Sequence, residues 1–176
     1  MLRAMKEQLK SLAKDENKEF HGHLRQKVGK KATALLEGRL KKIIVLLPDL
    51  VGRVYDYWRV QPHASQTKIL SAYVLTYLYL PKDFLPEDEW GLYGYLDDAY
   101  LVAKVYTTIL DEVERSGGKI DAADQKLSEE VKLLQKSLRI VIPKICEKID
   151  EMIAELAEGK QDAYLGIFNN AGISKV

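Results

Sequence analysis

Apolar residues recur along most of this chain at steps of three and four, the spacing that places side chains on one face of an α-helix. The pattern begins with Leu2, Met5, Leu9 and Leu12. Apolar residues make up 47% of the 176 residues and charged residues 30%, a balance typical of a folded globular chain. No segment repeats with a period of about 20 to 50 residues, as it would in a solenoid. The sequence therefore predicts an all-α fold, built as a compact bundle.

Breaks in the pattern divide the chain into about six or seven predicted helices. Pro48 is predicted to start a new helix, because the N–H group that proline lacks forms no intrahelical hydrogen bond at the first helical position. Pro143 either kinks the sixth helix or starts a seventh. The predicted helices cover residues 2–12, 24–47, 48–58, 65–80, 97–116, 121–142 and 143–159. Ser65 and Asp121 are predicted to cap the helices that they begin, and Gly117-Gly118 is predicted to end the fifth helix.

Residues 1–159 are expected to form a single helical domain, with residues 65–115 at its centre and residues 160–176 as a partly docked C-terminal tail. The one cysteine, Cys146, excludes a disulfide framework and fits a reducing compartment. The longest uncharged apolar stretch, residues 69–81, has 13 residues, whereas a membrane-spanning helix needs about 20. We therefore expect a cytoplasmic protein, either soluble or peripheral to a membrane.

Charge is distributed unevenly along the chain. The first 60 residues carry 14 Lys and Arg against 7 Asp and Glu, and the remaining residues carry 13 against 19. A basic first third suits contact with an anionic membrane, through Lys27, Lys30, Lys31, Lys41 and Lys42. The alternative is that basic and acidic segments pack together and neutralise one another. Nucleic-acid binding is not favoured, because the segment lacks interleaved aromatic residues and any recognised DNA-binding motif.

The most unusual stretch is Pro81-Lys82-Asp83-Phe84-Leu85-Pro86, followed by Gly94-Tyr95-Leu96-Asp97-Asp98. Asp98 lies four residues before Val102 on the apolar stripe of its helix, so its carboxyl group is expected on the core face. A buried carboxylate needs a partner, since an unpaired buried charge costs several kcal/mol. The candidate partners are backbone amides of the loop, a tyrosine hydroxyl, a metal ion, or one of the cations Lys82, Arg53 and Arg59.

This stretch resembles the core motif of the YkvA-like family of unknown function, in which Pro-x-Asp-x-x-Pro follows an apolar helix and Gly-x-x-Asp-Asp opens the next one. The likeness covers residues 69–105. The matching positions are Pro81, Asp83, Pro86, Gly94, Asp97 and Asp98. The resemblance implies a helical fold and, for many members, an association with membranes. No activity is established for the family, so the resemblance implies no reaction.

Asp83, Asp97 and Asp98 are the candidate metal ligands, because Mg²⁺ and Mn²⁺ prefer carboxylate and water oxygens. They converge only if the loop folds back on the helix that follows it. The alternative is structural: Asp83 bonds backbone N–H groups of its own turn, and the other two stabilise the positive start of a helix.

Other candidates have simpler structural roles. His21 and His23 are expected to be solvated, because residues two apart point to different helix faces. Residues 87–89 are expected to form a solvated acidic loop, and Trp90 beside them marks a possible docking point. The chain has 10 tyrosines, several near the motif. Two interpretations are open: the tyrosines line a ligand pocket or an interface, or, more simply, their hydroxyls satisfy Asp83 and Asp98.

These features favour a non-enzymatic helical binding or scaffold module that acts through a protein partner or an anionic membrane surface. The alternative is a metal-dependent, hydrolase-like enzyme that uses Asp83, Asp97 and Asp98. No catalytic residue is predicted, and no cofactor other than a divalent metal ion at these aspartates.

Overall fold

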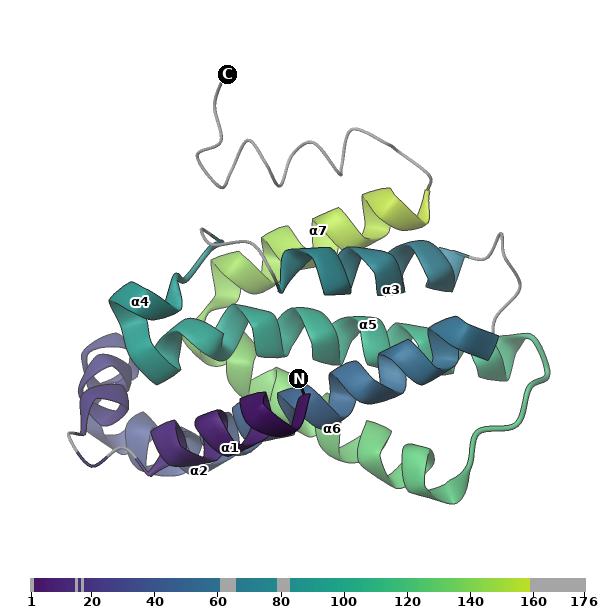
Figure 1. Ribbon diagram of the computed structural model, residues 1–176. Helices are drawn as coiled ribbons and strands as arrows, with labels where there is room; N and C mark the ends of the chain where they lie inside the picture. The colour runs from purple at the N-terminus through teal and green to yellow at the C-terminus, as the bar shows by residue number, and fades with distance from the viewer. Residues whose placement is uncertain (1, 15, 17, 61–65, 79–82, 159–176) are drawn as a thin grey trace, which may run out of the picture.

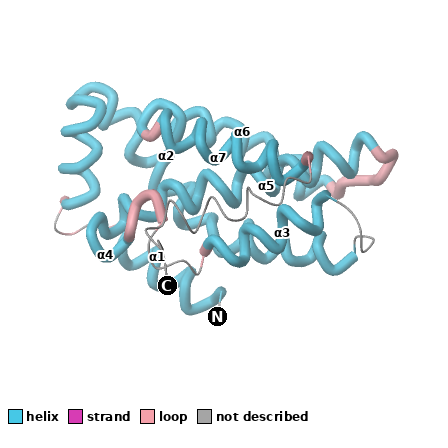
Figure 2. Tube along the Cα trace, turned by 90° about the horizontal axis from the view of Figure 1, so that it is seen from above, coloured by secondary structure: helices cyan, strands magenta, loops and turns pink. Residues whose placement is uncertain are grey.

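The computed structural model describes residues 2–14, 16, 18–60, 66–78 and 83–158. Within these ranges the chain consists of helices and loops without a strand (Figure 2), which confirms the predicted all-α bundle. In the same ranges no helix is both long enough and apolar enough to cross a membrane. The predicted C-terminal tail, residues 160–176, lies outside the described residues, as does the predicted helix cap at Ser65.

The first two helices are α1 (Leu2–Ala13) and the long α2 (Glu19–Val60). The prediction that Pro48 starts a new helix was wrong, because α2 continues through it. Proline inside a helix costs about 3 kcal/mol. Burial of Leu47, Leu50 and Val51 around it, at about 1.5 to 3 kcal/mol per side chain, outweighs that cost.

The break in α2 occurs instead at Gly29, whose φ of 79° and ψ of 167° are not helical. Glycine reaches a positive φ without steric cost, because it has no Cβ. The segment before Gly29 therefore lies at an angle to the rest of α2 and covers one end of the bundle (Figure 1). Phe20 and Leu24 on this segment are buried, so the segment belongs to the core despite the break.

The centre of the chain contains α3 (Gln66–Tyr77), the single turn α4 (Glu87–Trp90), the 3₁₀ turn η1 (Gly91–Gly94) and α5 (Tyr95–Arg115). Residues 87–94, expected to form a loop, are thus helical turns. The backbone N–H groups of Glu89 and Trp90 both donate to the carbonyl oxygen of Pro86, at 3.1 and 3.0 Å. Proline is well suited to this position, because the N–H group that it lacks would have no hydrogen-bond partner at the start of a helical turn.

The last two helices are α6 (Ala122–Val141) and α7 (Pro143–Ala157). Asp121 caps α6 as predicted, since its Oδ1 accepts a hydrogen bond of 2.7 Å from the N–H of Asp124. Gly117, with a φ of 78°, follows the end of α5. Pro143 is the first residue of α7, so of the two alternatives left open by the sequence it starts a helix.

Helix α5 runs through the middle of the bundle, with α3 and α7 on one side and α2 and α6 on the other (Figure 1). Its central position explains why almost every residue from Leu96 to Leu110 is buried. Any polar side chain on α5 must therefore find a partner within the protein.

Two buried or half-buried aspartates on the neighbouring helices α6 and α7 are partnered by cations and hydroxyl groups. Asp124 forms an ion pair with Arg53, and its carboxylate accepts hydrogen bonds from Tyr57 at 2.9 Å and Tyr106 at 2.7 Å. Its network joins α2, α5 and α6.

Asp150 on α7 is partnered in the same way. It pairs with Arg139 and Lys104 and accepts hydrogen bonds from the Tyr100 hydroxyl at 3.1 Å. The two networks show how this fold neutralises carboxylates in its interior.

Candidate functional site

The motif folds into a tight corner in which residues 83–94 lie against the start of α5. Gly94 makes this close approach possible. A Cβ atom there would lie 2.7 Å from the Cα atom of Glu87 and 2.8 Å from the carbonyl oxygen of Leu85. Real Cβ atoms do not approach backbone atoms so closely, so a side chain at this position would push α4 away from α5. The glycine of the motif therefore determines how near the residues of α4 come to those of α5.

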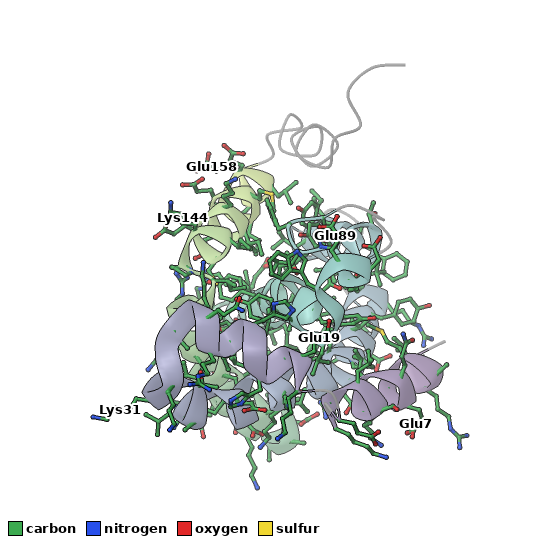
Figure 3. All side chains as sticks on the ribbon, turned by 90° about the vertical axis from the view of Figure 1, so that its left-hand side faces the viewer. Glu7, Glu19, Lys31, Glu89, Lys144 and Glu158 are labelled. Atoms are coloured by element: carbon green, nitrogen blue, oxygen red, sulfur yellow. The ribbon has the colours of Figure 1, made fainter. Side chains whose placement is uncertain are left out.

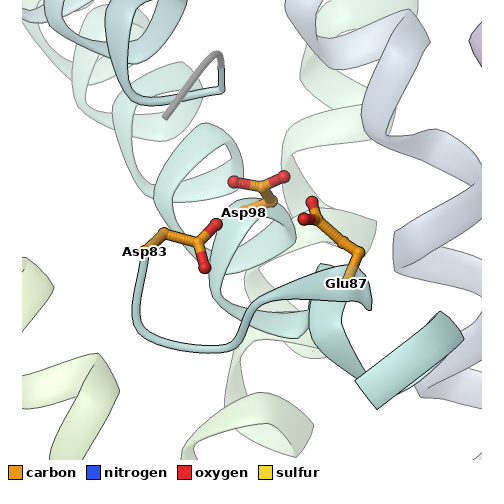
Figure 4. Close-up of side chains that lie close together, drawn as sticks. All are labelled: Asp83, Glu87 and Asp98. Carbon is orange, nitrogen blue, oxygen red and sulfur yellow. The ribbon is translucent and has the colours of Figure 1, made fainter. Parts of the chain in front are cut away.

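Three carboxyl groups converge in this corner. Asp83 from the loop, Glu87 from α4 and Asp98 from α5 each offer one oxygen, and these oxygens lie within 4.8 Å of one another. Figure 4 shows the Asp98 carboxyl group between the other two, with all three groups turned toward one another. Asp98 is 2% exposed, whereas Asp83 and Glu87 are half-buried, so the cluster has a buried base and an accessible rim.

The loop geometry predicted for Asp83 is confirmed in one respect. Its Oδ1 accepts a hydrogen bond of 3.1 Å from the N–H of Leu85, two residues on, as expected of an aspartate in a turn. This bond orients the carboxyl group toward α5. The sequence motif thus brings Asp83 and Asp98 together.

Asp97 is placed differently from the other two predicted ligands. Its carboxyl group is fully buried, and its Oδ2 accepts a hydrogen bond of 2.9 Å from the hydroxyl of Tyr77 on α3. It is not a member of the converging group. Successive residues of a helix point about 100° apart, so Asp97 and Asp98 face different neighbours.

The electrostatics of the corner follow from burial and from repulsion between like charges. Burial, and then the charge of Glu87, raises the pKa of Asp83 to about 6. Burial is also the largest cause that raises the pKa of Asp98 well above its ordinary value, followed by the charges of Asp97 and Glu87. The pKa of Asp97 is raised by burial and by Asp83, while the hydrogen bond from Tyr77 acts in the opposite direction. Burial and the neighbouring negative charges thus make Asp83, Asp97 and Asp98 harder to ionise.

Two oxygens in this corner lack the partners found elsewhere in the fold. Among the described residues, neither Oδ1 of Asp97 nor Oδ1 of Asp98 has a hydrogen-bond partner. The contrast with Asp124 is direct, because its carboxylate receives an arginine and two tyrosine hydroxyls. Native proteins rarely leave buried polar atoms unsatisfied, and a bound ion can act as the missing partner of such an atom.

The donor set is suited to a hard divalent cation. All three converging groups are carboxyl groups, which Mg²⁺, Mn²⁺ and Ca²⁺ prefer, and the set contains no imidazole or thiol that would favour softer metals. A cation between them would offset the repulsion between these like charges. It would also tie the loop and α4 to α5.

Glu87 is the functional residue that the sequence analysis missed. The acidic run that it forms with Asp88 and Glu89 is typical of a solvated loop. Those two are exposed, but Glu87 is half-buried because α4 turns it inward. The available signal was Pro86, since a proline followed by acidic residues is typical of the first turn of a helix.

The remaining predicted candidates have other roles. His21, predicted to be solvated, lies 2.8 Å from the Glu37 carboxylate, and His23 packs its ring 5.2 Å from that of Trp90. Tyrosine hydroxyls do bond aspartates, but in the described residues they reach Asp97, Asp124 and Asp150 rather than Asp83 or Asp98.

The basic face predicted for α2 is partly occupied by ion pairs. Lys41 pairs with Glu37 at 2.8 Å, and Lys42 pairs with Glu130 on α6. Lys27, Lys30 and Lys31 are exposed near the Gly29 break. Local neutralisation, the alternative in the sequence analysis, thus applies to Lys41 and Lys42.

No protein family, curated protein or solved structure matches this chain.

Proposed function

We propose that this chain is a cation-binding helical module in which Asp83, Glu87 and Asp98 hold a divalent ion such as Mg²⁺, Mn²⁺ or Ca²⁺. The observation that carries the proposal is the Asp98 carboxyl group. It is 2% exposed, its Oδ1 has no hydrogen-bond partner among the described residues, and it lies between two other carboxyl groups (Figure 4). A cation supplies the missing partner and neutralises the group at once.

We favour a binding role over a hydrolytic one. An ion held by these three groups would fasten the corner formed by the loop and α4 to the central helix. Asp83 and Asp98 are also positions of the YkvA-like motif, a resemblance that adds no reaction.

Thermal melts with and without each cation test the proposal. A cation at about 100 times its dissociation constant stabilises the folded state by about 2.7 kcal/mol, which raises the midpoint by roughly 5 to 11 °C for a chain of this size. Asp98→Asn should abolish this shift, and its melt without cation should not be lower than that of the wild type, because the amide carries no charge in the buried corner at any pH. Glu87→Gln should weaken the shift in the same direction.

Glu89→Gln is the matched control, because Glu89 is exposed on the same turn and outside the cluster. It should keep the full cation response. An equal shift in Asp98→Asn and wild type would overturn the proposal, as would the absence of any shift with all three ions. Hydrolysis of p-nitrophenyl phosphate by the cation-loaded protein, lost in Asp98→Asn, would replace the binding role with the enzymatic alternative.

A second candidate function is contact with an anionic membrane surface. It rests on Leu35, which is 74% exposed on the same helix as the exposed Lys30 and Lys31. An apolar side chain beside lysines suits the boundary between headgroups and acyl chains. Sedimentation with phosphatidylserine vesicles at low salt tests this, and equal sedimentation of Leu35→Ser and wild type would exclude it.

A further inference from the structure

A second feature of the same end of the bundle is a cavity of about 470 Å³ that is separate from the carboxyl cluster. Three parts of the chain enclose it: the α2 segment before Gly29, the α4–η1 turns, and the junction between α6 and α7. Figure 3 looks onto this end, with Lys144 of α7 and Glu89 of α4 on opposite sides of the view. The volume lies within the range of about 300 to 1,000 Å³ that is typical of small-molecule sites.

One wall of the cavity is aromatic. The rings of His23, Trp90 and Tyr93 all line it, and their centroids lie 5.2 to 5.9 Å apart at tilted angles. Tyr93 is buried and braced by Phe20 at 6.0 Å, whereas Trp90 is half-buried and keeps part of its ring accessible. Ile142 and Ile145 add apolar surface opposite. A flat, apolar body would fit against this wall.

The charged groups of the cavity have one sign. Lys27 from α2 and Lys144 from α7 line it, and none of the described residues that line it is acidic. The larger cavity of about 900 Å³ differs in this respect, because Asp49, Asp56 and Glu130 line it together with basic side chains. Of these two cavities, the smaller therefore has the clear electrostatic preference, and it is for an anion.

The start of α7 adds to this preference. Ile142 occupies the N-cap position and provides no side-chain hydrogen bond to the first turn. The residues that open α7, Pro143, Lys144 and Ile145, line the cavity. The N-terminal end of a helix carries partial positive charge, so it reinforces the two lysines.

We call this cavity the Trp90 pocket. We propose that it binds a small organic anion with a flat aromatic body, held between the aromatic wall of His23, Trp90 and Tyr93 on one side and the cations Lys27 and Lys144 on the other. The anionic group lies at the start of α7 beside Lys144. The aromatic body stacks on the accessible part of Trp90. The pocket uses none of the three carboxyl groups of the proposed cation site, so it extends the proposed function and can fail independently of it.

Quenching of Trp90 fluorescence tests this proposal. The chain has two tryptophans, so the measurement uses Trp58→Phe, in which Trp90 is the sole reporter. The probe is 2-naphthoate, compared with its neutral analogue 2-naphthamide and with inorganic phosphate, all in buffer with EDTA so that no cation takes part. We expect saturable quenching by 2-naphthoate, and binding of 2-naphthamide at least about tenfold weaker. Phosphate alone should not quench.

Variants of the lining test the geometry. Lys144→Gln should weaken 2-naphthoate binding by about five- to tenfold, whereas Lys136→Gln, an exposed lysine of α6 outside the pocket, should leave it unchanged. Equal binding of the acid and the amide, saturable quenching by phosphate alone, or equal effects of the two lysine variants would each overturn the proposal. A lack of saturable quenching by 2-naphthoate in the folded Trp58→Phe protein would overturn it as well.

Discussion

Glu87 on α4 and Asp98 on α5 turn their carboxyl groups toward one another, and one oxygen of each lies within 4.8 Å of the other and of an Asp83 oxygen (Figure 4). Two acidic groups placed so closely repel one another unless a proton or a cation lies between them. The stability of this corner is therefore expected to depend on pH and on divalent cations. Asp124 on α6 and Asp150 on α7, by contrast, already have basic partners.

The free energy of unfolding of this protein without cations is expected to fall as the pH rises. Burial and Glu87 raise the folded-state pKa of Asp83 to about 6, and burial, followed by the charges of Asp97 and Glu87, raises the pKa of Asp98 well above its ordinary value. A carboxyl group whose pKa is raised by folding binds its proton more tightly in the folded state than in the unfolded state. Its proton therefore stabilises the folded protein below the unfolded-state pKa, and this stabilisation is lost as the pH rises through the folded-state pKa. Without cations, the Asp83 contribution should fall by about 1 kcal/mol between about pH 4 and pH 7, after allowance for its partial exposure.

Urea denaturation in EDTA across this pH range measures the effect. The comparison is with Asp83→Asn, which removes the titrating carboxyl group and should lose stability less steeply with rising pH. Groups elsewhere, such as Glu37 with its lowered pKa, are common to both proteins and cancel. A wild-type curve that rises relative to the variant over this interval would contradict the assigned sign.

Gly94→Ala should disturb the corner from within. Its new Cβ would lie 2.7 Å from a backbone atom of Glu87, so α4 must move. We expect a loss of about 1 to 3 kcal/mol of unfolding free energy, the range for overpacked sites, together with a weaker cation response. Calorimetric melts measure both.

Gly38→Ala is the matched control, because a Cβ at Gly38 on α2 would meet no atom within 4 Å. Alanine is favoured over glycine in a helix by about 1 kcal/mol, so this variant should be slightly stabilised. Equal stability of the two alanine variants would show that α4 does not pack on Gly94 as described.

Tyr77→Phe separates the role of Asp97 from that of the cluster. The variant removes the hydroxyl that donates to Oδ2 of Asp97, and loss of a partner for a buried polar group costs about 1 to 3 kcal/mol. The cation response should persist, because Tyr77 bonds none of the three converging groups. Titration calorimetry with Mn²⁺ on the folded variant checks this. Loss of Mn²⁺ binding by a fully folded Tyr77→Phe would make Asp97 a ligand after all.

Asp124→Asn should be among the most damaging substitutions in the bundle. It leaves Arg53 without its ion pair and weakens two tyrosine hydrogen bonds that join α2, α5 and α6. A loss of about 3 kcal/mol is expected from guanidinium denaturation, since breaking a buried pair on one side is costly. Asp111→Asn, which affects an exposed pair with Lys132, should cost no more than about 1 kcal/mol. Similar losses in both would contradict the special role of Asp124.

Local sequence signals were sufficient to predict features that depend only on neighbouring residues. The cap at Asp121 and the stop at Gly117 depend on a few neighbouring residues, and both lie where the sequence predicts them. The burial of Asp98 followed from its position on the stripe of Val102. Pro48 is the counterexample, because packing against the rest of the bundle outweighs a local preference that the sequence expresses strongly.

The sequence by itself determined that the chain is all-helical, that a loop with Asp83 precedes a helix with Asp98, and that this aspartate needs a partner. Only the tertiary structure decided which groups meet. Glu87 turns inward while Asp88 and Glu89 stay in solvent, and Arg53 pairs with Asp124 rather than Asp98. The reason is that helical periodicity depends on residues only a few positions apart in the sequence. The partner of a buried charge depends instead on how whole helices cross, which local sequence patterns do not determine.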